Sequence, residues 1–226
     1  MWIIFLSLCC LFASCSVQAQ DNSSVRALFV EDQRDRGIPY SDDGVHMLPK
    51  AEADKLPDHS QDFGERDAGR LKQVKALLEK GSIVTAHDFR YAAILFQHGQ
   101  QPDDYLMAHV LAIRAVGLGD LSSQNVAAVT LDRYLQSIGR GQIFGSQYLT
   151  ESFAYRLQHS TEKDVDEKAA AKGDGDTLQP YEESLVPDSL RHAFCIPSLA
   201  EQKKAVEDAR KTKNLEIPIV KDCHFK

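Results

Sequence analysis

The pattern of apolar and polar positions is most regular between residues 85 and 147. Apolar residues recur at helical spacing over 85–98, 102–116 and 122–138. Glycines, which often end helices, stand near these boundaries: Gly81, Gly99, Gly117 and Gly139. Because short connections force neighbouring helices to run antiparallel, we predict an all-α fold. We expect an antiparallel helical bundle or a short helix-pair array, with irregular loops and an extended C-terminal tail.

Local sequence also predicts where some helices begin and which side of a helix is buried. Thr85 with Asp88, and Ser198 with Glu201, have the spacing of a capping box. The buried side of the helix over 102–116 is predicted to consist of Leu106, Val110, Ile113 and Val116.

Composition divides the chain into five segments. They are a signal peptide over 1–19, an N-terminal helix and loop over 20–62, a helical core over 63–159, a low-complexity insert over 160–180, and C-terminal helices with a tail over 181–226. The insert is rich in charged residues and lacks an apolar period, which predicts disorder or weak helicity. In the early helix, Asp32 and Arg36 are four residues apart, and we expect them to form a solvated pair at the helix end.

The N-terminal segment predicts export. Residues 1–19 contain no charge and carry an apolar run that ends on the small-x-Ala pattern Val17-Gln18-Ala19. A cleaved signal of this kind would make the protein periplasmic or extracellular. The apolar run is too short for a membrane span, so we expect no span after cleavage. The alternative is lipidation of Cys15, which would anchor the protein to the envelope.

Two cysteines, Cys195 and Cys223, lie beyond the predicted signal peptide. An exported protein can form disulfides, so the pair either bridges the C-terminal tail or remains as two free thiols. Neither belongs to a CxxC pair, and we expect no metal site.

Composition and motifs exclude several classes of function. The 226 residues carry a net charge of -7, and no block of Lys and Arg faces a set of aromatic residues, so nucleic-acid binding is not expected. A nucleophile elbow, a phosphate-binding loop and a dinucleotide fingerprint are all missing from the sequence. We therefore expect no cofactor.

Polar residues beside the apolar stripes are the candidates for chemistry. His98 follows a predicted helix, whose dipole favours the protonated imidazole, and it suits a general acid or a capping residue. His109 borders a buried stripe, as core histidines do. Asp132 and Arg133 are adjacent, so they do not share a helix face and each needs its own partner. If both histidines converge with Asp132, they would form an acid–base pair or a metal site, although no established ligand spacing supports a metal.

Four further residues are candidates for binding a ligand: Gln97, Arg140, Gln142 and Gln147. The last three lie in the glycine-rich corner over 139–147, where glycines let the backbone approach other groups closely. Two interpretations stay open. The polar groups either lock this corner onto the helices or line a small polar pocket.

Several segments in this order form a recognisable set: Phe96-Gln97-His98-Gly99, Asp104-Tyr105-Leu106-Met107-Ala108-His109, Leu131-Asp132-Arg133-Tyr134-Leu135, Gly139-Arg140-Gly141-Gln142-Ile143-Phe144-Gly145-Ser146-Gln147 and Arg191-His192-Ala193-Phe194-Cys195-Ile196-Pro197-Ser198-Leu199. They resemble a bacterial domain family of unknown function whose members often have QH, then DR, then G-x-P-Q-x-[YF]-G-T-Q, then R-x-x-x-G-[LI]-P-[PS]-L. The chain departs from that pattern at Gly141, Ser146 and Phe194. The resemblance covers about residues 31–202. It implies that these positions are shared with the family, but it implies no reaction.

The expected function is a non-catalytic binding or interaction domain at the cell envelope or outside the cell. Its partner would be an unknown protein or small-molecule ligand. The alternative is a hydrolase-like enzyme built from His98, His109, Asp132 and Arg133, with Gln142 and Gln147 orienting a substrate.

Overall fold

The computed structural model describes residues 19–57, 62–159, 161–173, 175–220 and 223. This part of the chain is mostly helical and adds a two-stranded sheet, which confirms the predicted all-α fold. Cys15 and the predicted signal peptide up to residue 18 lie outside the described residues. Within the described ranges, no helix combines the length and the hydropathy that crossing a membrane requires.

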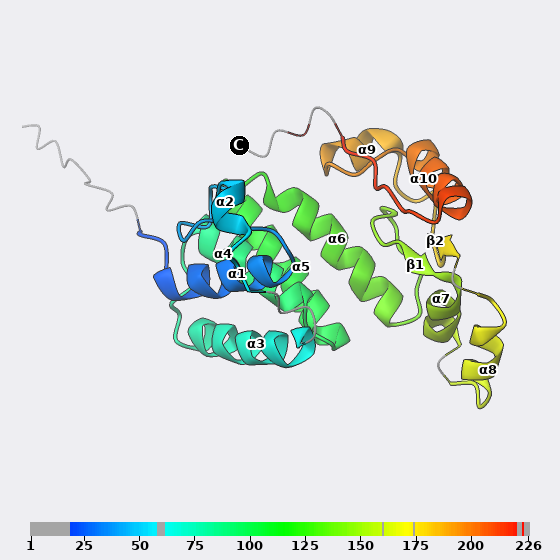
Figure 1. Ribbon diagram of the computed structural model, residues 1–226, viewed down its shortest axis with the longest axis horizontal. Coiled ribbons are helices and arrows are strands. Elements are labelled where there is room, and N and C mark those ends of the chain that lie inside the picture. Colours follow the sequence, from blue (N-terminus) through cyan, green and yellow to red (C-terminus); the bar gives the residue numbers. More distant parts are fainter. Residues whose placement is uncertain (1–18, 58–61, 160, 174, 221–222, 224–226) are drawn as a thin grey trace, which may run out of the picture.

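Ten helices and two short strands follow one another along the described chain (Figure 1). The first six helices are α1 (Ser23–Asp35), α2 (Lys50–Ala53), α3 (Phe63–Glu79), α4 (Ala86–Gln97), α5 (Pro102–Gly117) and α6 (Ser123–Ser137). The remaining elements are β1 (Leu149–Thr150), α7 (Glu151–Gln158), α8 (Val165–Ala170), β2 (Asp176–Thr177), α9 (Asp188–Ala193) and α10 (Leu199–Thr212).

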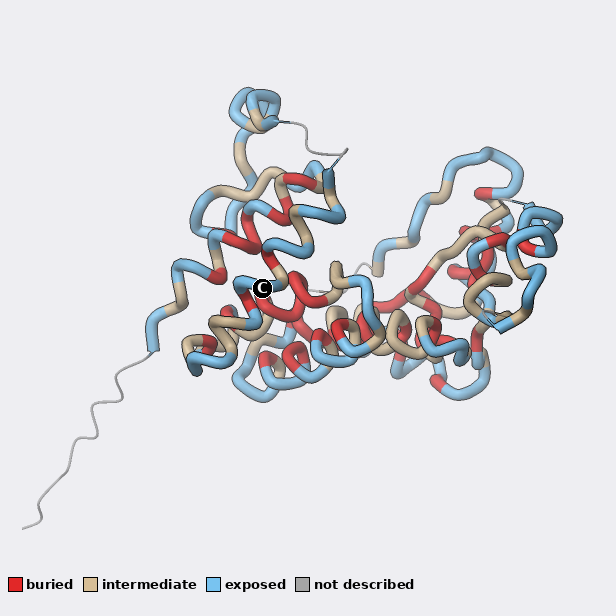
Figure 2. Tube along the Cα trace, turned by 90° about the horizontal axis from the view of Figure 1, so that it is seen from below, coloured by how far each residue is buried: buried red, intermediate tan, exposed pale blue. Residues whose placement is uncertain are grey.

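The N-terminal part is a bundle in which α4 packs against α1, α3, α5 and α6. Every residue over 91–96 is buried, and these residues join Phe29 of α1 and Val74 of α3 in one hydrophobic core. The rings of Phe29 and Tyr91 stack with their centroids 4.5 Å apart. Buried residues gather where these helices face one another (Figure 2). A helix covered on several sides in this way is typical of a compact bundle.

Both predicted capping boxes are present. Thr85 and Asp88 exchange side-chain and backbone hydrogen bonds at the start of α4, and Ser198 and Glu201 do so at the start of α10. The carboxylate of Asp88 also accepts a 2.7 Å hydrogen bond from the backbone N–H of Asn22, the residue that caps α1. One carboxylate therefore fixes the starts of two packed helices.

The buried side of α5 differs from the prediction. Val110 and Ile113 are 53% and 49% exposed, whereas Ala108, Ala112 and Ala115 are fully buried. The reason is that α5 lies between α4 and α6, and small alanine side chains let the two neighbours approach closely. Since the helix is apolar on more than one side, periodicity by itself could not select the side that packs.

The segment predicted as a disordered or weakly helical insert, over 160–180, contains regular structure. It supplies α8 and the strand β2, which pairs antiparallel with β1 so that Leu149 lies opposite Thr177. The short pairing holds the insert against the segment that leads into α7, and β2 also contacts α10. These contacts join distant segments, which local composition does not encode.

The C-terminal tail is extended, as predicted, with no regular structure over 214–220. It runs back along α10 towards α9 (Figure 1). A disulfide joins Cys223 to Cys195, with the two Cα atoms 5.5 Å apart. Of the two states left open by the sequence, the structure contains the bridged one.

Candidate functional site

A polar pocket of about 420 Å³ lies between the bundle and α7. Its lining comes from the ends of α1 and α4, the first turn of α5, the last turns of α6, the glycine-rich corner, β1 and α7. The lining residues are Arg36, Gln97, His98, Gly99, Tyr105, Arg133, Gln136, Ser137, Gln147, Tyr148, Leu149, Phe153 and Leu157. We call this hollow the Arg133 pocket.

Arg133 places a cation in the pocket lining. Its Nη1 donates to the carbonyl oxygen of Gln97 at 2.7 Å, and its Nε donates to Oε1 of Gln147 at 3.2 Å. Its guanidinium carbon lies 5.9 Å from the centroid of the Tyr105 ring. Burial lowers the pKa of Arg133, and the nearby Arg36 lowers it further. No carboxylate among the described residues pairs with Arg133, so its charge lacks a counter-ion.

His98 is held by a buried carboxylate. Its Nδ1 lies 2.9 Å from Oδ1 of Asp32. Asp32 is fully buried, and its Oδ2 accepts a 2.8 Å hydrogen bond from Nε2 of Gln33. A carboxylate at Nδ1 fixes the tautomer and the orientation of an imidazole, and it leaves Nε2 for another partner. Since His98 lines the Arg133 pocket, this pair could act there as an acid or a base.

Behind His98 lies a cluster of charges that neutralise one another. Arg36 contacts Asp32 at 2.8 Å and Asp67 at 2.7 Å, and Arg70 contacts Asp67 at 2.7 Å and Asp35 at 2.6 Å. Burial alone would raise the pKa of Asp67, but the hydrogen bonds from Arg36 and Arg70 outweigh it and lower that pKa. The cluster ties α1 to α3 and supports the carboxylate that orients His98.

The same cluster contains three groups of the kind that ligate metals. Ligand atoms of Asp32, Asp67 and His98 lie within 4.8 Å of one another. However, Nη1 of Arg36 contacts Oδ1 of Asp32 and Nη2 contacts Oδ2 of Asp67. A guanidinium bridging two of the three groups competes with any cation for the same oxygens. The donor set therefore fits an ion-pair cluster better than a metal centre.

Asp132 holds the glycine-rich corner. It is fully buried, and its two oxygens accept from the backbone N–H groups of Ile143, Phe144 and Ser146, at 2.8, 3.0 and 2.9 Å. The Ser146 hydroxyl donates a fourth hydrogen bond at 2.8 Å. Burial raises the pKa of Asp132 in spite of these donors. Of the two interpretations left open by the sequence, these hydrogen bonds of Asp132 agree with the one in which polar groups lock the corner onto the helices.

Of the other candidate residues from the sequence, some line the pocket and some join helices elsewhere. Gln97, His98, Arg133 and Gln147 line the pocket together. His109 is not among its lining residues, and its Nδ1 donates to the Ala127 carbonyl oxygen at 2.9 Å, which ties α5 to α6. The structure therefore does not unite the two histidines with Asp132.

Gln142 and Arg140 also lie outside the pocket lining. Gln142 is fully buried, where its Nε2 donates to the carbonyl oxygens of Gln147 and Leu178 and its Oε1 accepts from the Gln147 N–H. Arg140 is exposed. Gln142 thus positions the corner, and Gln147 reaches the pocket because of it.

Several residues of the site were missed by sequence reasoning. Asp32 and Arg36 were expected to be a solvated pair, but Asp32 is fully buried and Arg36 lines the pocket. Tyr105, Gln136 and Tyr148 were not singled out either. The spacing of Asp32 and Arg36 was the one visible sign of the cluster, but its burial depends on α3 and α4, which are distant in sequence.

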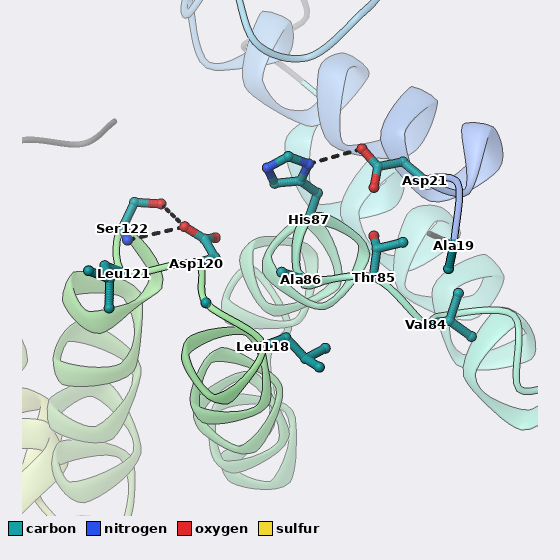
Figure 3. Close-up of a pocket in the computed structure, with 11 residues that line it drawn as sticks. Ala19, Asp21, Val84, Thr85, Ala86, His87, Leu118, Asp120, Leu121 and Ser122 are labelled. Atoms are coloured by element: carbon teal, nitrogen blue, oxygen red, sulfur yellow. Dashed lines mark hydrogen bonds and ion pairs between the residues drawn. The ribbon is translucent and has the colours of Figure 1, made fainter. Parts of the chain in front are cut away.

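A second hollow, of about 720 Å³, lies near the starts of α4 and α6 (Figure 3). Its carboxylates already have hydrogen-bond partners, because Asp21 contacts Nδ1 of His87 at 2.9 Å and Asp120 accepts from the N–H of Ser122 at 3.1 Å. None of its lining residues has a buried polar atom without a partner in the described structure.

Searches of family models, curated proteins and solved structures for relatives of the chain gave no match.

Proposed function

We propose that this chain is a non-catalytic binding domain whose Arg133 pocket captures the anionic group of a small molecule or of a protein partner. The observation that carries the proposal is the Arg133 guanidinium, which lines the pocket without a carboxylate partner among the described residues. The surrounding amides of Gln97 and Gln136 add hydrogen-bonding groups for an oxygen-rich ligand.

The energetics favour an anion at this place. Removing an ion from water is costly unless a counter-ion or several hydrogen bonds compensate. Arg133 has hydrogen bonds from two of its nitrogens to neutral groups, and those bonds do not balance its charge. A bound carboxylate or phosphate would supply the missing charge and could use the planar fork of the guanidinium.

The test is ligand-induced stabilisation of the purified mature protein. We expect at least one of a panel of carboxylates, phosphate and sulfate to raise the melting temperature, and we expect Arg133→Gln to abolish the rise. Arg140→Gln is the matched control, because Arg140 is exposed and lies outside the pocket. Binding that is equal in Arg133→Gln and wild type, or no binding of any anion, would reject the proposal.

A second candidate function rests on the contact between His98 and Asp32. A hydrolase-like enzyme could use Nε2 of His98 as a general base towards a water molecule, with Asp32 stabilising the imidazolium. Turnover of ester, amide or glycosidic substrates by wild type, abolished in His98→Gln and retained in His109→Gln, would favour this function. Equal background hydrolysis in all three proteins would remove it.

We also propose that the domain acts outside the cytoplasm. The support is the uncharged apolar run with its small-x-Ala ending, together with the disulfide between Cys195 and Cys223. Mass spectrometry of the native protein should find an N-terminus at Gln20 in the envelope or medium fraction. A lipid mass on Cys15 would indicate the anchored alternative, and an intact Met1 in the cytoplasm would contradict export.

A further inference from the structure

The charge balance around the Arg133 pocket limits the kind of anion that can bind there. An inference about that anion rests on the proposed anion-binding function. The ion-pair cluster behind the pocket matches Arg36, Arg66 and Arg70 with Asp32, Asp35 and Asp67. Next to it, Lys75 is paired with Asp104 at 2.8 Å.

Among the described residues, Arg133 is therefore the guanidinium of this region that keeps an uncompensated positive charge. A single excess charge is balanced by a monoanion, whereas a phosphate dianion would bring a second negative charge close to the carboxylates of Asp32 and Asp67. The charges thus favour a carboxylate over a phosphate.

Two pocket residues carry polar atoms that the protein leaves unpartnered. Nε2 of Gln136 and the hydroxyl oxygen of Tyr148 are shielded from solvent, and neither has a hydrogen-bond partner within the described chain. Gln136 as a whole is 3% exposed. A half-turn of its amide about the last side-chain bond exchanges nitrogen and oxygen, so Gln136 can present either group. An amide in the ligand would satisfy both residues, because it offers a C=O acceptor and an N–H donor.

The remaining wall of the pocket is apolar. Leu149, Phe153 and Leu157 line it from β1 and α7, and Phe153 is 47% exposed. A ligand side chain that covers Phe153 would remove apolar surface from water, which favours binding. A volume of about 420 Å³ lies within the usual range for a small-molecule site.

We propose that the Arg133 pocket binds an α-amido monocarboxylate with an apolar side chain. In this arrangement Arg133 pairs with the carboxylate, Gln136 and Tyr148 bind the amide, and the wall of Leu149, Phe153 and Leu157 covers the side chain. Two sources contain the same chemical unit, namely the C-terminal end of a peptide and a free N-acyl amino acid.

Calorimetric titration of the full mature protein tests this assignment. N-acetyl-leucine is the probe, and N-acetyl-leucinamide, 4-methylpentanoate and inorganic phosphate are the comparison ligands. We expect N-acetyl-leucine to bind, and we expect affinity to fall at least about tenfold on loss of either the charge or the acylamino group. An acetylated tripeptide ending in leucine that binds more tightly than N-acetyl-leucine would identify a peptide as the source, and equal affinity would identify the free acyl amino acid.

A variant at Gln136 separates amide recognition from simple charge attraction. In Gln136→Leu, the preference for N-acetyl-leucine over 4-methylpentanoate should shrink, while the affinity for 4-methylpentanoate itself stays close to that of wild type. Gln158→Leu is the control, because Gln158 is exposed on α7 outside the pocket lining.

The possible failures can be told apart. Phosphate binding that depends on Arg133 and exceeds that of N-acetyl-leucine would overturn this inference and leave the proposed anion-binding function standing. Equal affinity for N-acetyl-leucine and its amide would also overturn it. The absence of Arg133-dependent binding by any anion would overturn both.

Discussion

Nδ1 of His98 lies 2.9 Å from Oδ1 of Asp32, although the two residues are 66 positions apart in the sequence. The contact joins the end of α4 to the last part of α1. It places a buried carboxylate behind a histidine that lines a pocket, and Arg36 connects the same carboxylate to α3 through Asp67. Stability and the candidate site therefore depend on the same few groups.

Replacing Asp32 with asparagine should destabilise the protein strongly. Asp32→Asn leaves Arg36 and His98 without their buried acceptor charge, and breaking a buried ion pair on one side costs about 3–5 kcal/mol. Urea unfolding should show this loss in the free energy of unfolding. Asp42→Asn is the control, since the Asp42 side chain is 93% exposed and its ion pair contributes about 1 kcal/mol at most. Similar losses in the two variants would contradict the role assigned to Asp32.

Acid should weaken the same cluster. Burial alone would raise the pKa of Asp35, but hydrogen bonds from Arg66 and Arg70 outweigh it and lower that pKa in the folded state. A depressed carboxyl pKa contributes stability that is fully present above the unfolded value of about 4 and is lost as the pH falls through the folded value. The melting temperature should therefore drop steeply below about pH 4.

The comparison that tests this pH dependence is Asp35→Asn against wild type over the same range. The variant lacks the titrating carboxyl, so its melting temperature should be lower at pH 7 and should fall less on acidification. Parallel curves for the two proteins would show that Asp35 does not contribute to acid unfolding.

Two glycine-to-alanine changes should have opposite effects. Gly145 has a positive φ of 80°, and an added Cβ would collide with Oε1 of Gln202 and the hydroxyl of Tyr181. Gly145→Ala should cost at least about 2 kcal/mol. Gly117→Ala, at the end of α5, meets nothing within 4 Å and should be neutral or stabilising by up to about 1 kcal/mol. Thermal unfolding of both variants measures the difference, and equal effects would contradict the described packing of the corner.

Loss of the disulfide should lower stability by a predictable amount. The bond between Cys195 and Cys223 closes a loop with a sequence separation of 28, for which loop-closure entropy gives about 3–4 kcal/mol. Cys223→Ser and reduced wild type should unfold at the same urea concentration, below that of oxidised wild type. Coincident curves for oxidised and reduced wild type would show that the bridge does not stabilise the fold.

Local interactions explain which features could be predicted from the sequence. The starts of α4 and α10 depend on Thr85 with Asp88 and on Ser198 with Glu201, contacts that span three residues. Helical content and helix ends follow from periodicity and glycines, which are also local. The sequence by itself therefore determined the all-α class and the positions of the main helices.

The site depended on contacts that no local pattern contains. Asp32 is buried because α3 and α4 cover it. Gln136 lines the pocket because α7 packs beside α6. Asp132 binds the backbone of the glycine-rich corner because the chain turns back towards it after α6. The packed side of α5 was likewise decided by its two neighbours. Tertiary structure decided these features because each joins residues that meet only when the helices pack.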